Sequence, residues 1–481
     1  MPMNASLVKR ITVIGGPTLF VLLQLLLPES IFPGHAKSVV SIGAWMVLWW
    51  ITEPVPIPIT SLLPLVIMPL AGITTMKEAA QPYGDPVIFL FMGGFILALG
   101  LEKYRLHQRI ALTLIRMTGT SGNGIILGFM LATALISMWI SNTATAIMML
   151  PIASSVTSLI ARDLNMEQDP RFEKFATGLM LAIAYAASIG GMATIIGTPP
   201  NVVMVGHVKR TYGIDVPFAD WMIIGIPLML LVLTSCYVII TKILFRNNLD
   251  SIKGSGELIK NKLDEMGPMS PMERRVLWVF GFTCFFWIFR QGINQLAGGN
   301  FLDDTSIAIG GGILMFLIPS GQTGKNLLEW KDMKEMQWGI LLLFGGGMAL
   351  AEGMEKSGIV EQIGSYFRDN KISGTVLIFS LTLISMALTE LMSNVALVTI
   401  FVPVVFGIAE GAGINPVYLA LPVTFAASCA FMMPISTPPN AILFASGYIR
   451  MKEMIKTGLL LNLFSLVIIF ILSITIMEKI F

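Results

Sequence analysis

Long apolar runs alternate with short polar stretches along nearly the whole chain. A membrane-spanning helix needs about 20 predominantly apolar residues, so runs of this length predict spanning helices. About 11 segments meet this expectation or come close to it. They are residues 11–27, 38–53, 56–72, 86–103, 174–208, 220–245, 272–296, 303–319, 336–355, 416–449 and 454–478. The pattern therefore predicts an all-α polytopic membrane protein.

Two further apolar stretches, 123–161 and 372–410, are too long for one span and too interrupted for two. Each contains a Ser-Asn pair near its middle, Ser141-Asn142 in the first and Ser393-Asn394 in the second. Non-helical backbone at membrane depth is tolerated only where it faces protein or a water-filled cavity. We therefore expect two re-entrant helical hairpins with these pairs at their tips.

A broken-helix signature also occurs twice. Thr198-Pro199-Pro200-Asn201 recurs as Thr437-Pro438-Pro439-Asn440, and each copy lies inside an apolar run long enough to cross a bilayer. Proline removes a backbone donor and interrupts the helix at these points. Such interruptions at matching positions of two halves are the best indication in a sequence of a transporter's binding site. The chain is therefore expected to contain two long copies of one unit.

The repeat divides the chain into five regions. These are scaffold helices in 1–85, a first repeat in 86–245, a linker in 246–271, further scaffold helices in 272–335, and a second repeat in 336–481. The first repeat contains hairpin 123–161 and broken helix 174–208, and the second contains hairpin 372–410 and broken helix 416–449.

The basic residues predict how the chain lies in the membrane. With the N-terminus in the cytoplasm, the larger share of the 31 Lys and Arg residues falls on the cytoplasmic side, as the positive-inside rule requires. The C-terminus is then outside, and the two repeats are inverted relative to each other. The polar linker is cytoplasmic and is expected to contain a short amphipathic helix.

Composition excludes several classes of protein. Hydrophobic residues make up 55% of the chain and charged residues 12%, whereas soluble domains carry about 25% charged residues. The three Cys and three His residues lack the spacing of metal ligands or of a disulfide framework. The net charge of +2 gives no indication of a nucleic-acid partner. The chain is thus expected to be neither a soluble protein nor an enzyme.

The repeated signature has a definite chemistry. Broken helices expose dipole ends, and their N-terminal ends favour anions whereas their carbonyl ends favour cations. The amides of Asn142 and Asn394 can donate to a carboxylate and offer oxygen to Na⁺. No residue of the motifs is Lys or Arg. An anion would therefore be held by neutral donors, with bound cations supplying positive charge.

The membrane potential then predicts that transport of an anion is coupled to the movement of cations. Moving one charge across a membrane is worth about 2.3 kcal/mol per 100 mV, so a dianion entering a negative-inside cell is opposed by roughly 4.6 kcal/mol per 100 mV. Two monovalent cations would cancel this cost, and the two matched clusters offer two cation positions. Glu390, four residues before Asn394, is an intramembrane acid and a functional candidate. It could equally lie near the entrance of the hairpin and pair locally.

At these motifs the chain resembles the divalent-anion/sodium symporter family, which includes dicarboxylate and citrate carriers. Residues 137–146, 389–396 and 427–440 are similar to the family's signatures, and the resemblance covers nearly the whole chain. It implies a homodimer in the lipid of the cytoplasmic membrane, with a scaffold domain and a transport domain that moves as an elevator. It also implies Na⁺ as the coupling ion.

The resemblance implies site residues by position. The first Na⁺ site would use Ser137, Ser141, Asn142 and Gly197, and the second would use Thr389, Met392, Asn394 and Ser436. Substrate carboxylates would rest on Asn142, Thr143, Thr198, Ser393, Asn394 and Thr437, with Val395 and Pro438 beside them.

One departure concerns the substrate. Many bacterial dicarboxylate members of the family have Thr where this chain has Val395, and family members with Val there include citrate carriers. Sodium-independent exchangers replace sodium ligands with basic residues, which are not seen here. We expect Na⁺-coupled uptake of a C4 dicarboxylate such as succinate, malate or fumarate. Citrate symport, dicarboxylate exchange, or a role as the membrane subunit of a sodium-pumping decarboxylase are the alternatives.

Overall fold

The computed structural model describes residues 5–163, 169–249, 255–370 and 372–477. These ranges are helical almost throughout and contain no β-strand, apart from one isolated bridge between Pro319 and Asn326. The prediction of an all-α protein is confirmed.

The N-terminal part forms five helices and a 3₁₀ turn. They are α1 (Ala5–Leu26), α2 (His35–Thr52), α3 (Ile57–Thr60), α4 (Leu63–Leu70), α5 (Met76–Ala80) and the turn Gln81–Gly84. The prediction of one helix over 56–72 is wrong, because α3 ends at Thr60. Pro64 cannot donate to the Thr60 carbonyl four residues earlier, and its ring collides with that carbonyl in a continuous helix.

The same order of helices then occurs twice. The first series is α6 (Pro86–Lys103), α7 (Leu106–Met117), α8 (Gly122–Ser137), α9 (Asn142–Asp163), α10 (Pro170–Gly191), α11 (Pro199–Tyr212) and α12 (Phe218–Val238), which continues as a π-helical turn over Ile239–Leu244. The second is α16 (Trp338–Lys356), α17 (Ile359–Asn370), α18 (Gly374–Leu388), α19 (Asn394–Ala412), α20 (Pro416–Ala427), α21 (Pro438–Phe444) and α22 (Met451–Leu472), with a π-helical turn over Ser473–Met477.

Three helices lie between the two series. They are α13 (Ser255–Glu265), α14 (Pro271–Ala297) and α15 (Asp304–Leu317), and a 3₁₀ turn over Trp330–Glu335 follows them. Helix α13 is the short helix expected in the linker 246–271, of which residues 250–254 lie outside the described residues.

Two helices, α7 and α17, do not appear among the predicted segments. Each follows the first helix of its series and precedes the hairpin. Their apolar residues lie on one face only, so neither helix contains the long apolar run by which spanning segments are recognised. Helix α7 packs against α8 and α13, and α17 packs against α19.

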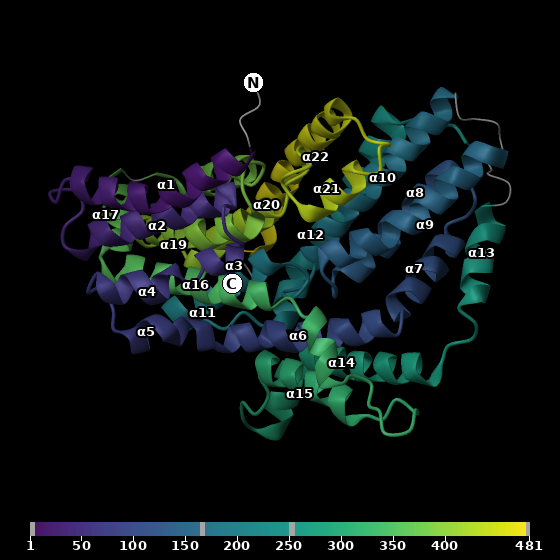
Figure 1. Cartoon of the computed structure of the whole chain (residues 1–481), viewed down its shortest axis with the longest axis horizontal. Helices are drawn as coiled ribbons and strands as arrows, with labels where there is room; N and C mark the ends of the chain where they lie inside the picture. Colours follow the sequence, from purple (N-terminus) through teal and green to yellow (C-terminus); the bar gives the residue numbers. More distant parts are fainter. Residues whose placement is uncertain (1–4, 164–168, 250–254, 371, 478–481) are drawn as a thin grey trace.

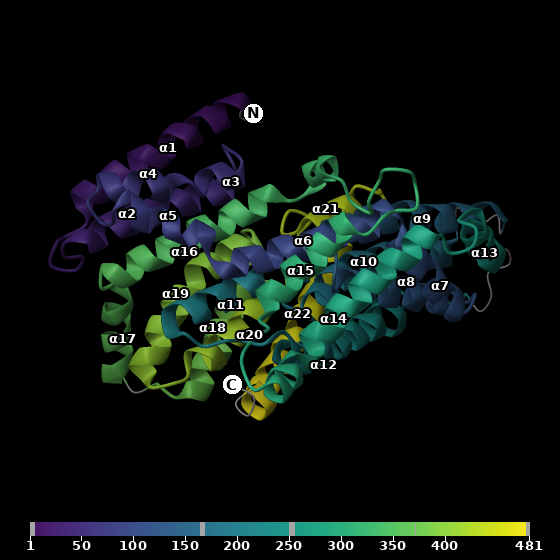
Figure 2. The same ribbon diagram turned by 90° about the horizontal axis from the view of Figure 1, so that it is seen from below.

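The two hairpins approach the centre of the molecule from opposite ends. Helices α8 and α9 extend toward one end of the long axis, and α19 extends toward the other end beside α17 (Figures 1 and 2). Helices α1–α5 cover the side that faces α16 (Figure 2). Each long apolar stretch is divided by a helix break, at residues 138–141 and 389–393, and the two helices on either side of each break contact each other, as expected for a hairpin.

Glycine allows the closest helix contacts, and these occur in matched pairs. Gly93 of α6 lies against the backbone of Ala308 in α15, while Gly346 of α16 lies against the carbonyl of Ser61 between α3 and α4. A Cβ atom at either glycine would overlap backbone atoms. Each series therefore begins with a helix packed on a segment from outside that series.

A second glycine pair lies beside the broken helices. Gly225 of α12 contacts the carbonyls of Met192 and Ala193, and Gly458 of α22 contacts the carbonyl of Phe431. Helices α12 and α22 also pack against each other. They therefore support the two unwound segments, 192–198 and 428–437, from one side.

Length and composition allow eight of the described helical segments to cross a membrane. These segments are Lys9–Leu26, Met76–Lys103, Asn142–Ala161, Pro170–Gly191, Phe218–Leu244, Pro271–Ala297, Asn394–Ala412 and Met451–Met477. Shorter apolar helices, among them α8, α15, α18 and α20, supply the remaining apolar length. The chain is thus a multi-pass membrane protein by its helices, and the larger number of spans remains a prediction.

The glycine contact at α22 is testable by adding one methyl group. We expect Gly458→Ala to lower the thermal unfolding midpoint of the purified protein in detergent, because overpacking against the Phe431 carbonyl costs about 1–3 kcal/mol. Gly281→Ala is the matched control, since Gly281 lies in α14 and no neighbouring atom lies within 4 Å of the place that the added methyl group would take. Alanine should be neutral or stabilising there. Equal midpoints for the two variants would contradict the packing described.

Candidate functional site

A cavity of about 190 Å³ lies where both hairpin tips and both broken helices meet. Its lining comes from α6, the two hairpins, the two Thr-Pro-Pro-Asn motifs and the start of α16. It comprises Phe91, Phe95, Ser141, Asn142, Thr143, Ile196, Gly197, Thr198, Pro199, Pro200, Gln337, Ile340, Ser393, Asn394, Val395, Ser436, Thr437, Pro438 and Pro439. All of these residues are uncharged, so a charged ligand must be held by neutral groups, by backbone dipoles, or by other ions.

Helices begin at this cavity. Helix α9 starts at Asn142, α19 starts at Asn394, and α11 starts immediately after Thr198. The Ser141 hydroxyl accepts the N–H of Ala144 at 3.1 Å, which leaves the other N–H groups of that first turn without an intrahelical partner. Unpaired N–H groups and the positive dipole ends make helix N-termini suitable for anions. The arrangement therefore favours an anion in the cavity.

The two hairpin tips are fixed by the same contact. Ser137 Oγ lies 2.6 Å from Asn142 Oδ1 and 2.7 Å from the Ala187 carbonyl oxygen. In the second series Thr389 Oγ1 lies 2.8 Å from Asn394 Oδ1 and also contacts the carbonyl of Ala427. A buried hydroxyl thus joins each tip asparagine to the end of the neighbouring broken helix.

The last residue of each Thr-Pro-Pro-Asn motif holds the unwound segment in place. Asn201 Nδ2 donates to the carbonyls of Gly191 and Thr194 at 3.1 and 2.8 Å. Asn440 Nδ2 donates to the carbonyls of Ala430 and Met433 at 2.9 and 3.1 Å. Gly191 is the last residue of α10, and the other three carbonyls lie in the unwound segments, where those of Thr194 and Met433 also accept the N–H groups of Gly197 and Ser436 at 3.3 Å. Each amide therefore supplies hydrogen bonds to carbonyls at and beyond the helix end, where regular helical bonding stops.

Several oxygens around the site have no hydrogen-bond partner in the part of the chain that the structure describes. They occur in matched pairs, Ser188 Oγ with Ser428 Oγ and Asn201 Oδ1 with Asn440 Oδ1, and all four are buried. Buried polar atoms normally have a partner. Hydroxyl and amide oxygens beside unwound backbone carbonyls are a donor set that suits Na⁺. The residues present therefore fit bound cations.

The structure brings most of the predicted site residues together. Eleven of them line the cavity, namely Ser141, Asn142, Thr143, Gly197, Thr198, Ser393, Asn394, Val395, Ser436, Thr437 and Pro438. Ser137 and Thr389 are fully buried behind the tips and reach the cavity through the tip asparagines. Met392 is half-buried, packs against the apolar core and does not line the cavity.

Sequence reasoning missed part of the lining. Gln337, Ile340, Phe91 and Phe95 belong to no recognised motif. The Phe91 ring stacks edge-on against that of Phe344, with centroids 5.1 Å apart, and Phe344 occupies the matching place in α16. That match follows the same spacing as Gly93 and Gly346, so it could have been found in the sequence. Gln337 has no counterpart and gave no such signal.

The cavity continues toward one face of the protein. A neighbouring cavity of about 460 Å³ shares Ser141, Thr143 and Gln337 with it and reaches Lys103 and Asp332. Lys103 Nζ lies 2.6 Å from Asp332 Oδ2. Burial alone would raise the pKa of Asp332, but the Glu329 N–H and the Lys103 ammonium outweigh it, so the net shift is downward. A charged pair therefore lines the neighbouring cavity, next to the neutral one.

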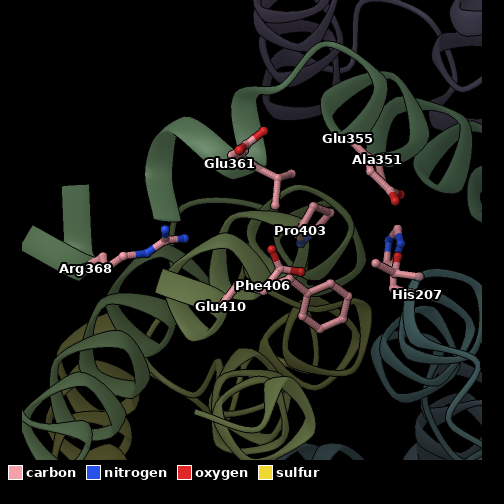
Figure 3. A pocket seen from close by; sticks show the side chains of 10 residues that line it. His207, Ala351, Glu355, Glu361, Arg368, Pro403, Phe406 and Glu410 are labelled. Atoms are coloured by element: carbon pink, nitrogen blue, oxygen red, sulfur yellow. The ribbon is translucent and has the colours of Figure 1, made fainter. Parts of the chain in front are cut away.

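A third cavity, of about 330 Å³, lies between α11, α16, α17 and α19. His207 and Glu355 lie side by side in it, and Glu410 lies between them and Arg368 (Figure 3). No group of three or more metal-ligating side chains that could hold a metal ion occurs within the described ranges. The charged side chains of this third cavity thus lie apart from the neutral central cavity, with which it shares no lining residue.

Comparison with known proteins gives a consistent result. Residues 8–479 match the sodium:sulfate symporter transmembrane region. The sodium-dependent dicarboxylate transporter SdcS of Staphylococcus aureus strain USA300 is 40% identical over 468 residues, which cover 96% of this chain and 90% of that protein.

Two solved structures share the fold at low sequence identity. The YdaH transporter of Alcanivorax borkumensis superposes with a TM-score of 0.57 at 14% identity, covering 83% of this chain and 87% of that one. MtrF of Neisseria gonorrhoeae superposes with a TM-score of 0.56 at 14% identity, covering 85% and 83%. Both support the helical architecture alone.

Proposed function

This chain belongs to the sodium:sulfate symporter family and is a membrane transporter coupled to Na⁺, and we propose that its cargo is a C4 dicarboxylate such as succinate, malate or fumarate. The observation that supports this proposal most directly is the uncharged cavity at which helices begin. It suits an anion whose charge is balanced by cations rather than by Lys or Arg. The similarity to a sodium-dependent dicarboxylate transporter supports the choice of substrate class.

In this proposal the substrate carboxylates are bound by the tip residues and by the starts of the broken helices. The groups assigned to them are those of Asn142, Thr143, Thr198, Ser393, Asn394 and Thr437, with Val395 and Pro438 completing the wall. One Na⁺ is assigned to Ser137, Ser141, Asn142 and Gly197, and another to Thr389, Met392, Asn394 and Ser436. The hydroxyl contacts of Ser137 and Thr389 with the tip asparagines support these assignments.

The proposed transport cycle is an elevator movement in a homodimer. The two hairpins and two broken helices would move together as a transport domain within the cytoplasmic membrane, while α1–α5, α14 and α15 remain with the scaffold. The N-terminus would be cytoplasmic. The tight contact of both hairpins with α10 and α20 supports a single moving body, because the shared hydroxyl bridges would otherwise have to break.

The alternative functions are supported to different degrees. Val395 lines the cavity at the place where a hydroxyl would offer one further donor, which favours citrate symport as the second candidate. Dicarboxylate exchange remains open within the family but lacks support from any basic residue in the lining. A role as the membrane subunit of a sodium-pumping decarboxylase is set aside, because the chain matches a family of transporters over residues 8–479.

The proposed function is tested by the cation dependence of uptake. We expect purified protein in proteoliposomes to accumulate succinate when an inward Na⁺ gradient is imposed, and to lose this accumulation when K⁺ replaces Na⁺. The physical reason is that a dianion moves against roughly 4.6 kcal/mol per 100 mV unless cations accompany it. Uptake that is unchanged in K⁺ would show that the symport proposal is wrong.

The tip asparagines are tested by truncation. Asn142→Ala and Asn394→Ala should each lower Na⁺-driven uptake at least tenfold, because each removes an oxygen from a proposed cation site and an amide donor from the substrate, and such bonds to charged groups contribute about 1.5–3 kcal/mol. Asn300→Ala in the exposed loop before α15 is the matched control. Near-normal uptake by either tip variant, in protein that elutes as the wild type does, would refute the assignment.

The wall residue Val395 is tested by restoring a hydroxyl. Val395→Thr should raise the ratio of succinate to citrate uptake several-fold while leaving the half-saturating Na⁺ concentration unchanged, because the new donor contacts substrate and not cation. Competition between the two labelled substrates measures the ratio. If the ratio stays constant, the residue does not set substrate preference.

A further inference from the structure

Glu390 has surroundings unlike those of any other acid in the described ranges. It is 7% exposed and takes part in none of the ion pairs found in that part of the chain. Its carboxylate instead accepts backbone N–H groups from three consecutive residues of the second unwound segment. The N···O distances are 2.9 Å from Phe431, 3.0 and 3.1 Å from Met432, and 3.3 Å from Met433.

Two side chains complete the coordination of this carboxylate. Ser436 Oγ donates to Glu390 Oε2 at 2.9 Å, and Asn462 Nδ2 of α22 donates to Oε1 at 2.8 Å. Successive backbone N–H groups that converge on one anion form a nest, which stabilises negative charge without a cationic side chain. Glu390 is therefore held as a buried anion by donors from two segments.

In the first series, two apolar residues occupy the positions that match Glu390 and Asn462. Met138 follows Ser137 as Glu390 follows Thr389, and Met229 lies four residues after Gly225 as Asn462 lies four residues after Gly458. Both methionines are buried. Because the acid and its amide partner are replaced together, the difference concerns the pair as a unit.

The two unwound segments also differ in where the preceding helix ends. Helix α10 continues to Gly191, and the N–H groups of Met192 and Ala193 then bond to carbonyls three residues earlier. Helix α20 ends at Ala427, three residues before Ala430, which matches Gly191 through the amide contacts of Asn201 and Asn440. The N–H groups of Ser428 and Cys429 also bond to carbonyls three residues earlier. Glu390 supplies the acceptor for the N–H groups that this earlier break releases.

This arrangement acts on a proposed Na⁺ ligand. The Ser436 hydroxyl proton is directed to the carbonyl or the carboxylate of Glu390, at 3.1 and 2.9 Å, which leaves the oxygen lone pairs free for a cation. The matching residue of the first series is Gly197, which has no hydroxyl. A cation bound to Ser436 Oγ would lie within about 6 Å of the carboxylate, a separation at which opposite charges stabilise each other appreciably.

We infer that Glu390 is a positioning residue for the second Na⁺ site: it holds segment 428–437 open, orients Ser436, and gives this site a fixed negative charge that the first site lacks. The inference rests on the proposed function. It means that the two cation sites are unequal, and that the second binds Na⁺ more tightly. Glu390 acts through Ser436 and the backbone and does not itself contact substrate.

The test compares Na⁺ dependence with substrate dependence. Glu390→Gln keeps the size of the side chain and removes its charge, and it should raise the half-saturating Na⁺ concentration for succinate uptake at least tenfold. The KM for succinate measured at saturating Na⁺ should change less than threefold. Glu410→Gln is the matched control, because Glu410 belongs to the same hairpin but is exposed and bonded to Tyr212.

A binding measurement separates this inference from the transport proposal. Na⁺ should raise the thermal unfolding midpoint of the purified wild type, since a ligand that binds only the native state stabilises it. For Glu390→Gln the midpoint curve should shift to at least tenfold higher Na⁺. If the wild type shows Na⁺-dependent stabilisation without Na⁺-driven uptake, the proposed function fails while Glu390 can still be assigned to the cation site.

A second variant keeps the inference open to refutation if the first does not fold. The double substitution Glu390→Met with Asn462→Met reproduces the pair that the chain itself contains at Met138 and Met229, and the same rise in Na⁺ requirement is expected. An unchanged Na⁺ half-saturation in either folded variant overturns the inference, even if the maximal rate falls. Failure of both variants to fold would also overturn it, since Glu390 would then be a purely structural residue.

Discussion

The structure depends on completing backbone hydrogen bonds at two points where helices unwind inside the apolar body of the protein. An unpaired N–H or C=O group in an apolar environment costs several kcal/mol, so a broken helix persists only where other groups replace its lost bonds. Asn201 and Asn440 bond the released carbonyls from within the motif. From the hairpins, Thr389 bonds the carbonyl of Ala427 at the end of α20, and Ser137 bonds that of Ala187 in the last turns of α10. The glycines of α12 and α22 let neighbouring helices close the remaining space.

The same replacements produce the site. The starts of α9, α11 and α19 meet at one small cavity, together with the ends of the unwound segments at Gly197 and Ser436. Anions and cations can then be bound next to each other without a charged side chain in the lining. In the proposed function, stability and binding therefore use the same neutral groups of the matched motifs.

Much of this could be predicted from the sequence because local chemistry carries it. Pro199 and Pro438 are the first residues of α11 and α21, where a missing N–H is tolerated, whereas Pro151 and Pro403 lie inside α9 and α19. The breaks therefore follow from the repeated Thr-Pro-Pro-Asn motif and not from proline alone. Ser141 precedes α9 as a cap, because its hydroxyl accepts the N–H of Ala144. The single helix over 56–72 is wrong because apolar length alone does not register the effect of Pro64 on the Thr60 carbonyl. Helices α7 and α17 escape an apolar-length criterion because their apolar residues occupy a single face.

Other features depend on tertiary contacts between distant segments. The partners of Glu390 come from residues 431–436 and from Asn462, which no local pattern connects with it, and both alternatives considered for this acid missed the backbone nest. Gln337 lies at the start of α16 and reaches the cavity only because that helix packs across the hairpin tips. The internal repeat predicts the residues that the two halves share, and it gives no information about the residues at which they differ.

Because Glu390 is present in the second half alone, it affects how anion binding would be coupled to cation binding. If both cation positions were equally weak, a carboxylate could occupy the neutral cavity before either cation and would meet only dipoles. A fixed negative charge beside one position favours a cation there first, and this cation then supplies the local field that a dianion requires. In the proposed mechanism the first position, built from neutral oxygens alone, would gain most of its affinity once the anion is present. An ordered sequence of binding would then follow from one acid placed in only one of two otherwise matched halves.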